Sequence, residues 1–420
     1  MPFTSFSAAL SALSANTTAI DVVGNNLANL STTGFKASTV SFQDLVTESL
    51  GAGLGETQVG FGVGVPLTTR EFTQGALQST GGVDDAAIQG DGFFVLHDST
   101  GAQQYTRAGN FTVDANGNLL SASGASVQGW AAVNGVVDTN GPTTNITVPV
   151  GTLQAPVAST QFSASMNLNA AATVGSTNGT FSTPVTVYDS LGTTHVLTLT
   201  FTETAGAAWN YSVSIPGEDL TSGTPGTPTV LTTGTINFDQ NGNLTTPPAA
   251  AGPIAVTAAG LTDGAADLNL NWNLYDANQQ PLLTQFAQIS AVSSVSQNGQ
   301  AAAQLVHVGI ADGGQILAQY SNGQQAVVGQ LAVASIRNPS SLLAVGNNNY
   351  EASSLTALPA VGVADTGGRG QVLGGQLESS TVDIATEFTN LIVYQRGYEA
   401  NAKVVNTADQ LSQDTINLIR

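Results

Sequence analysis

Residues 1–29 read MPFTSFSAALSALSANTTAIDVVGNNLAN, and their apolar side chains recur at helical spacing. Steps of four and three residues connect Phe6, Leu10, Leu13, Thr17, Ile20, Gly24 and Leu27. This spacing predicts a helix from about Phe3 to Ala28 whose apolar stripe must be buried against another helix. Asp21 is the only charged residue of the segment, whereas a surface helix normally has a charged outer face. We therefore expect close neighbours on several sides of this helix.

The other end of the chain repeats the pattern over residues 382–419. Its apolar stripe consists of Ile384, Phe388, Leu391, Tyr398, Val405, Leu411 and Leu418. Ser380-x-x-Asp383 is typical of a helix start, so we predict a helix from near Ser380 almost to Arg420. The partner of each stripe is the other end of the same chain or the ends of other copies. We favour assembly over a two-helix stalk within a monomer because the first helix is nearly free of charge.

Composition excludes several classes of function. The 420 residues include 28 Asp and Glu but only 8 Lys and Arg, a net charge of −20, which makes nucleic acid and anionic membranes poor partners. Between Arg107 and Arg337 there are eleven Asp and Glu and no Lys or Arg. The absence of cysteine excludes disulfides and thiolate sites. The first 35 residues lack the basic segment of a secretory signal, and polar residues interrupt their apolar positions, so we expect neither a cleaved signal nor membrane insertion.

The region between the helices is typical of β-structure. Alternating apolar and polar residues, as in Leu197, Leu199 and Phe201 set against threonines, predict antiparallel sheets with one buried face. The segment Asp114-Ala-Asn116-Gly117-Asn118 predicts a type I′ hairpin turn, and a similar segment follows residue 236. The predicted fold class is mainly β with terminal helices that form a coiled-coil-like core.

We divide the chain into nested parts on these patterns. The predicted parts are a terminal helical core (1–35 and 380–420), an extended linker (36–75 and 369–379), an inner β domain (76–153 and 290–368), and an outer β domain inserted into it (154–289).

No stretch indicates catalysis, a cofactor or a metal. His97, His195 and His307 have no paired or HExxH spacing, and we interpret them as residues on sheet surfaces. The segment Asp114-x-Asn116-x-Asn118 starts like a calcium loop but lacks the glycine at the sixth position and the closing glutamate. The glycine-rich stretches lack the Gly-Lys-Ser/Thr ending of a phosphate-binding loop.

Both ends of the sequence resemble the flagellar rod and hook proteins, the axial proteins of the bacterial flagellum. The N-terminal motifs are AIDVVGNNLAN (19–29) and TGFK (33–36), and the C-terminal motifs are YQRGYEAN (394–401) and KVVNTADQL (403–411). GDGFFVL (90–96), YTRAGNF (105–111) and GNLL (117–120) match the domain that the family shares. In the insert, MNLNA (166–170) and VTVYDSLG (185–192) carry the resemblance. The insert and the total length are similar to hook members rather than to the shorter distal rod members.

The resemblance implies a structural subunit of the flagellar hook, a curved hollow tube that acts as a universal joint between rod and filament. The implied partners are further copies of the chain, the distal rod protein, the hook cap protein, the hook–filament junction protein and the flagellar type III export apparatus. The implied location is extracellular. The apolar stripes and the matching motifs together predict the residues that act in assembly: Phe6, Leu10, Leu13, Ile20, Asn25, Asn26, Leu27, Asn29, Gly34 and Phe35, with Ile384, Phe388, Leu391, Tyr398, Asn401, Val405, Leu411 and Leu418.

Two other interpretations stay open at this point. A distal rod protein of the same family would be straight and stiff, and the 136 residues of the insert argue against it. A secreted β-rich adhesin or a β-helical surface enzyme would belong to an unrelated class. A β-helical enzyme would have short repeats and clustered carboxylates, and we find neither in the sequence.

Overall fold

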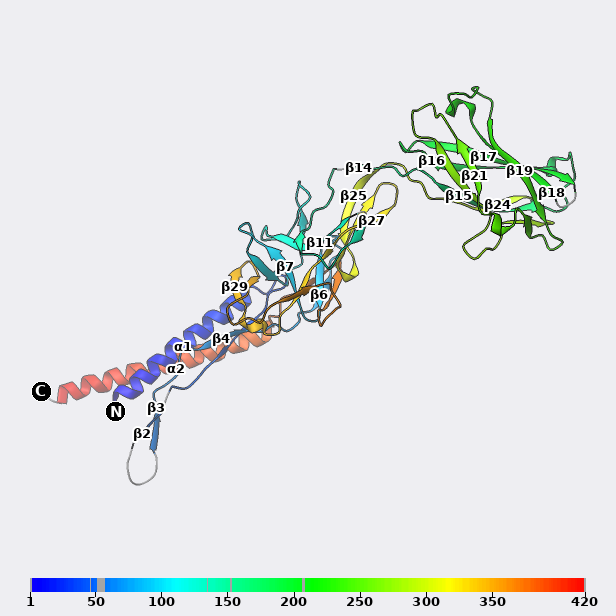
Figure 1. Ribbon diagram of the computed structural model, residues 1–420. Helices are drawn as coiled ribbons and strands as arrows, with labels where there is room; N and C mark the ends of the chain where they lie inside the picture. The colour runs from blue at the N-terminus through cyan, green and yellow to red at the C-terminus, as the bar shows by residue number, and fades with distance from the viewer. Residues whose placement is uncertain are drawn as a thin grey trace. The chain divides into compact units, whose positions relative to one another are not determined.

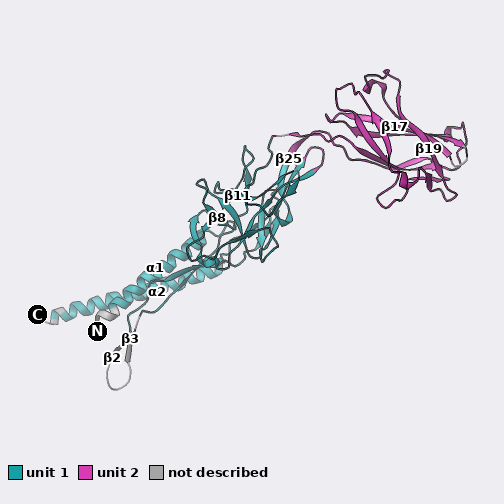
Figure 2. Ribbon diagram, viewed as in Figure 1, with its two compact units in different colours: residues 1–150, 307–319, 325–420 teal, residues 151–306, 320–324 magenta. Residues whose placement is uncertain are grey.

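The computed structural model describes residues 2–45, 47–50, 57–133, 135–151, 153–205 and 208–418. The chain forms two compact units (Figure 2). Unit 1 contains residues 1–150, 307–319 and 325–420, and unit 2 contains residues 151–306 and 320–324. The fold class predicted above is confirmed, because helices stand at the two ends and strands are the main regular structure between them.

Two long helices belong to unit 1. They are α1 (Pro2–Ala28) and α2 (Ile384–Leu418), and they lie side by side with both chain ends at the same end of the pair (Figure 1). The start of α2 differs from the prediction. Asp383 caps it, since its Oδ1 accepts the N–H of Thr386 at 2.8 Å, whereas the Ser380 hydroxyl accepts the N–H of Val382 before the helix begins.

A mainly antiparallel sheet forms the body of unit 1. Its central path runs β25-β26-β27-β11-β7-β8-β30-β29. These strands are β7 (Phe93–His97), β8 (Gln103–Thr106), β11 (Ser126–Val133), β25 (Ala303–Ile310), β26 (Gln315–Tyr320), β27 (Gln325–Leu331), β29 (Leu343–Gly346) and β30 (Asn349–Glu351). Shorter strands attach to it: β9 (Thr112–Val113), β10 (Leu119–Leu120), β12 (Val136–Val137), β13 (Thr144–Asn145), β28 (Val333–Ser335) and β31 (Ala360–Gly362). A core that includes Phe93, Tyr105, Trp130 and Tyr350 fills its interior.

The segments that we expected to be extended linkers contain paired strands. On the N-terminal side β1 (Ser38–Ser41) pairs with β4 (Leu67–Arg70), and β2 (Thr47–Leu50) pairs with β3 (Thr57–Gly60). On the C-terminal side β32 (Gln371–Gly374) pairs with β6 (Ala86–Gln89), and β33 (Gln376–Glu378) pairs with β5 (Leu77–Ser79). The N-terminal segment therefore pairs with itself, whereas ladder hydrogen bonds hold the C-terminal segment on β5 and β6.

Unit 2 is a sandwich of two sheets around one core. The first sheet is ordered β21-β22-β15-β23, with β24 also on β15, and the second is ordered β16-β17-β18-β19-β20. The bounds are β15 (Gln161–Asn169), β16 (Thr180–Tyr188), β17 (Thr194–Ala205), β18 (Ala208–Ile215), β19 (Thr229–Phe238), β20 (Leu244–Thr246), β21 (Ile254–Ala258), β22 (Leu268–Asn273), β23 (Leu283–Phe286) and β24 (Ala291–Gln297), and β14 (Leu153–Gln154) precedes them. Trp272 of one sheet packs against Phe201 and Tyr211 of the other.

Three details of this region differ from the expectations. Unit 2 extends to Val306 rather than to residue 289, because β24 pairs along β15. Its first sheet is mixed, since β15 pairs in parallel with β22 and β23, strands that follow about a hundred residues later. The turn at 114–118 is a hairpin but not type I′: Gly117 has a positive φ of 83°, whereas Asn116 is not among the described residues with positive φ. The Asp114 carboxylate accepts the N–H groups of Asn116 and Asn118 and so holds this turn without a second positive φ.

Candidate assembly surface

The helices α1 and α2 pack closely against each other. Asn26 meets Glu387, and Asn16 lies beside Gly397, so the two helices run antiparallel. A side chain at Gly397 would place its Cβ 2.9 Å from Oδ1 of Asn16, which shows how closely the helices approach. The buried residues of α1 are Ala9, Ala15, Ala19, Val23 and Asn26. The helices therefore pair as expected, but through a face of α1 that the apolar stripe does not occupy.

The predicted stripes lie beside this contact rather than on it. On α1, Phe6 is 39% exposed and Leu10 is 54% exposed, while Leu13, Ile20 and Leu27 are half-buried. On α2, Ile384, Phe388, Tyr398 and Leu411 are exposed at 42–59%, while Leu391, Asn401 and Val405 are half-buried. The side chain of Leu418 lies outside the described residues. Large apolar groups at such exposure are typical of a surface that another molecule covers.

Three residues of the N-terminal motifs make contacts within the chain. Asn26 is fully buried: its Nδ2 donates to the backbone oxygen of Ser38 and to Oε1 of Glu387, both at 2.8 Å, and its Oδ1 accepts the N–H of Ser38. Phe35 is 5% exposed. Gly34 has φ +67°, and a Cβ there would lie 2.6 Å from the carbonyl carbon of Arg107, so no other residue fits. These residues hold α1 on the β-structure of unit 1.

A buried ion cluster completes this junction. Glu378 accepts the Lys36 ammonium at 2.6 Å and Nη1 of Arg107 at 3.3 Å, and its side chain is fully buried. Its Oε1 also accepts the N–H of Gly75. Burial lowers the pKa of Lys36 and of Arg107, and the Glu378 carboxylate opposes the shift in both. Sequence reasoning quoted Lys36 and Arg107 within motifs but missed the cluster. Four of only eight Lys and Arg fall inside the quoted motifs, Lys36 and Arg107 among them, and this was the signal available in the sequence.

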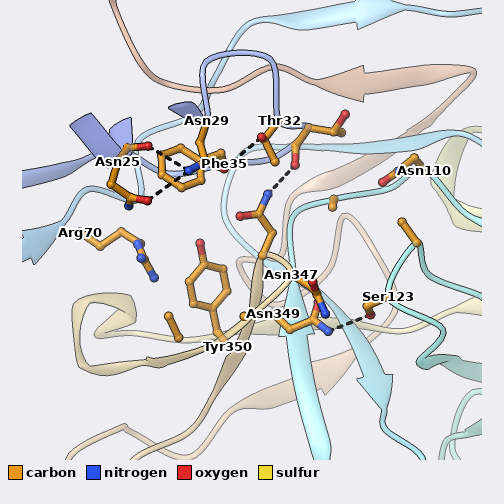
Figure 3. A pocket seen from close by; sticks show the side chains of 16 residues that line it. Asn25, Asn29, Thr32, Phe35, Arg70, Asn110, Ser123, Asn347, Asn349 and Tyr350 are labelled. Atoms are coloured by element: carbon orange, nitrogen blue, oxygen red, sulfur yellow. Dashed lines mark hydrogen bonds between the residues drawn. The ribbon is translucent and has the colours of Figure 1, made fainter. Parts of the chain in front are cut away.

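Asn25 and Asn29 face a polar cavity of about 540 Å³ (Figure 3). The other labelled residues in its wall include Arg70, Asn347 and Tyr350, and the Arg70 guanidinium carbon stands 5.2 Å from the centre of the Tyr350 ring. Asn29 donates back to the carbonyl and side-chain oxygens of Asn25, so this pair is held on the last turn of α1. The cavity lies within unit 1, where α1 leads into the β-structure.

The histidines are placed differently from one another. His307 is exposed and His97 is half-buried, but His195 is 5% exposed, so interpreting it as a sheet-surface residue is wrong. Carboxylates surround it in unit 2. None of the described helices is long and apolar enough to cross a membrane.

Models of flagellar protein families match successive parts of the chain. Residues 6–36 match "Flagella basal body rod protein", residues 87–163 match "Flagellar hook protein FlgE/F/G D1 domain", residues 170–300 match "Flagellar basal body protein FlaE D2 domain", and residues 373–418 match "Flagellar basal body rod FlgEFG protein C-terminal". The first and last of these contain the paired helices, and the third covers most of the sandwich.

Relatives match along the full length. The flagellar hook protein FlgE of Salmonella typhimurium is 33% identical, over 99% of this chain and 100% of the relative. That of Treponema pallidum is 32% identical, over 96% of each chain. The crystal structure of the Helicobacter pylori flagellar hook protein FlgE2 is similar in fold, with a TM-score of 0.51, 15% identity, and coverage of 70% of this chain and 99% of that one.

The chain has terminal helices packed together and β units between them in sequence. With these matches, that architecture defines a structural protein of the flagellar axis. Within that class the assignment is specific, since both relatives described above align over at least 96% of this chain and are hook proteins. The chain belongs to the flagellar hook protein FlgE family.

Proposed function

We propose that this chain is the structural subunit of the flagellar hook, and that copies of it polymerise into a curved tube that transmits torque from rod to filament. The observation that carries the proposal is the exposed apolar surface on α1 and α2, which the pairing of the two helices leaves uncovered. Burying one Leu, Ile or Phe side chain contributes about 1.5–3 kcal/mol, so a few such residues per copy suffice to hold a polymer together.

The remaining partners follow from the same proposal. A hook subunit would contact the distal rod protein at one end of the tube, and the cap and junction proteins at the other. It would reach the cell exterior through the flagellar type III export apparatus. The resemblance of both terminal segments to axial proteins supports these partners. Nucleic acid and membranes have no part in the proposal, because a chain with net charge −20 would be repelled by phosphate groups.

The test compares two pairs of substitutions in the full chain. Replacing Phe6 and Leu10 by Ser removes apolar area from α1. Replacing Leu355 and Leu358 by Ser removes apolar area from unit 1 outside the helices, where these side chains are 80% and 94% exposed. Each purified variant is allowed to polymerise and is then viewed by negative-stain microscopy. We expect curved tubes from the parent and from the second pair, and none from the first.

Deletion of residues 1–30 provides a second test. The deletion spares Lys36 and its ion cluster, so the β units should remain folded and the fragment should be a soluble monomer. Polymers of this fragment would contradict the role of the terminal helices. Straight tubes from the parent chain would favour the distal rod protein, and absence of any polymer would favour an adhesin.

A further inference from the structure

A histidine in unit 2 lies among three carboxylates. His195 Nδ1 is 2.9 Å from Oδ2 of Asp219, and its Nε2 is 3.2 Å from Oδ2 of Asp189 and 4.0 Å from Oδ2 of Asp263. The Asp189 side chain is fully buried and the His195 ring is 5% exposed. The ligand atoms of Asp189, His195 and Asp263 all lie within 4.8 Å of one another.

Separate loops bring these groups together. Asp189 stands in the turn between β16 and β17, His195 is on β17, and Asp219 is in the short helix η2 (Gly217–Asp219). Asp263 follows β21, and its loop is tied to η2 by the N–H of Thr262, which donates to the backbone oxygen of Asp219 at 3.0 Å. Oδ1 of Asp189 already accepts the N–H groups of Leu191 and Thr193, so only its Oδ2 is directed at the histidine.

The hydrogen-bonding groups around His195 require a proton or a metal ion beside its ring. A neutral imidazole has one N–H donor and one acceptor nitrogen. When Nδ1–H donates to Asp219, the lone pair of Nε2 faces the oxygens of Asp189 and Asp263, which are also acceptors. That contact is repulsive unless a proton or a metal ion occupies the space between the three atoms.

The charge balance of unit 2 points the same way. Residues 151–306 include eight Asp and Glu and no Lys or Arg, and His195 is the only histidine among them. No basic side chain of the unit can therefore offset the three carboxylates except the imidazole that they surround. A divalent cation would offset two of the three negative charges of the cluster, whereas a single proton offsets only one.

We propose that Asp189, His195 and Asp263 bind a divalent transition-metal ion of the zinc type, with Asp219 orienting the imidazole. One nitrogen and two carboxylate oxygens are a donor set that such ions accept, and a water would complete the coordination. Ligand atoms of a tetrahedral zinc site lie about 3.4 Å apart, close to the 3.2 Å between His195 and Asp189. Asp263, on an exposed loop, has to approach by a few tenths of an ångström. A carboxylate on the second ring nitrogen is the usual support of a metal-bound histidine.

The experiment titrates the untagged full chain with Zn²⁺ by calorimetry. The buffer has about physiological ionic strength, because salt then screens the weak attraction of Zn²⁺ to exposed carboxylates. Co²⁺ serves as a second probe, whose visible absorption reports nitrogen and oxygen ligands directly. The variants are Asp263→Asn, His195→Gln and Asp219→Asn. The control is Asp276→Asn, which removes a carboxylate of the same unit from a turn where the side-chain oxygen accepts the N–H groups of Asn278 and Gln280, as an asparagine also can.

We expect one Zn²⁺ per chain in the parent and in the control. Binding should be at least about tenfold weaker with Asp219→Asn and weaker still with the other two variants. Asp263 is exposed, so its variant tests the site even if His195→Gln perturbs folding, which near-ultraviolet dichroism of Trp209 and Trp272 would detect. No saturable binding, or equal binding by parent and Asp263→Asn, would overturn the proposal and leave His195 as an imidazolium held by carboxylates.

Discussion

At the scale of single residues, Glu378 is the residue on which the junction of unit 1 depends most. Its carboxylate is the ion-pair partner of both Lys36 and Arg107 and accepts the N–H of Gly75. Replacing it by Gln removes the ion-pair partner of two buried cations, and removing one partner of a buried ion pair costs about 3–5 kcal/mol.

Lys36→Met should cost less free energy of unfolding, because Glu378 keeps its ion pair with Arg107. Urea unfolding followed by far-ultraviolet dichroism measures both, with the exposed Glu71→Gln as control. Equal stability of Glu378→Gln and the parent would contradict the role of this cluster.

The buried carboxyl group of Glu387 leads to a prediction about how stability depends on pH. Burial raises the pKa of this carboxyl; the Asn26 amide opposes the shift and the Asp383 carboxylate adds to it. A carboxyl with a raised folded-state pKa stabilises the fold when protonated, and that contribution is lost as pH rises through the raised value. Glu387→Gln, which still offers Asn26 an acceptor, should therefore raise the melting temperature at neutral pH.

The gain from Glu387→Gln should shrink as pH falls toward about 4, where the parent residue is protonated as well. Thermal unfolding of the assembled parent and variant over this range checks the difference, because the terminal helices that form this contact are expected to be folded in the polymer. Glu399→Gln, at an exposed ion pair with Arg396, should show no such trend. A lower melting temperature of Glu387→Gln at neutral pH would show that the negative charge itself stabilises the contact.

At the scale of elements, the terminal helices are the part of the fold that depends on other copies. Isolated helices gain little stability from local propensity, and most comes from packing of an apolar face. Because Phe6 and Leu10 of α1 and four stripe residues of α2 are exposed in the single chain, we expect these helices to be largely unfolded in the free subunit and to fold on assembly. Far-ultraviolet dichroism should show a clear gain of helix on polymerisation. Full helicity of the monomer would be incompatible with this expectation.

The strands of unit 2 show how much of an element its own sequence determines. Leu197, Leu199 and Phe201 were predicted to share a buried face, and each is 0% exposed. Alternation was sufficient there because one side of each strand faces the core. It could not reveal the parallel pairing of β15 with β22 and β23, since the partner of a strand depends on the path of the chain and not on its local pattern.

At the scale of the whole molecule, charge affects assembly. Each copy has a net charge of −20, so copies repel one another in a polymer, and salt screens that repulsion over about 10 Å at 0.1 M. Raising the salt concentration should therefore lower the concentration of subunit at which polymers form, as measured by sedimentation. Assembly that is independent of salt would show that the repulsion is negligible.

Bending is a second property of the whole molecule. A universal joint needs copies that slide against one another, and uncharged polar surfaces suit this because water replaces their hydrogen bonds easily. Unit 2 has no Lys or Arg, so it cannot form Lys or Arg salt bridges that would fix one position. Introducing Lys–Glu pairs where copies meet through unit 2 should stiffen or straighten the tube in electron micrographs. Uncharged Ser–Thr pairs at the same positions are the control, and unchanged curvature and swimming would refute this account of flexibility.

Sequence alone determined that the chain ends in two helices, that strands lie between them, and that the ends carry the motifs of flagellar axial proteins. These properties are local, since periodicity and motifs are determined by residues close together in the chain. Only the tertiary structure decided that α1 buries Ala15, Ala19 and Val23 and leaves Phe6 and Leu10 exposed. It also decided that Lys36, Arg107 and Glu378 share one buried site, and that His195 lies among carboxylates. Such contacts join residues far apart in the sequence, and the chain path that brings them together has no local signature.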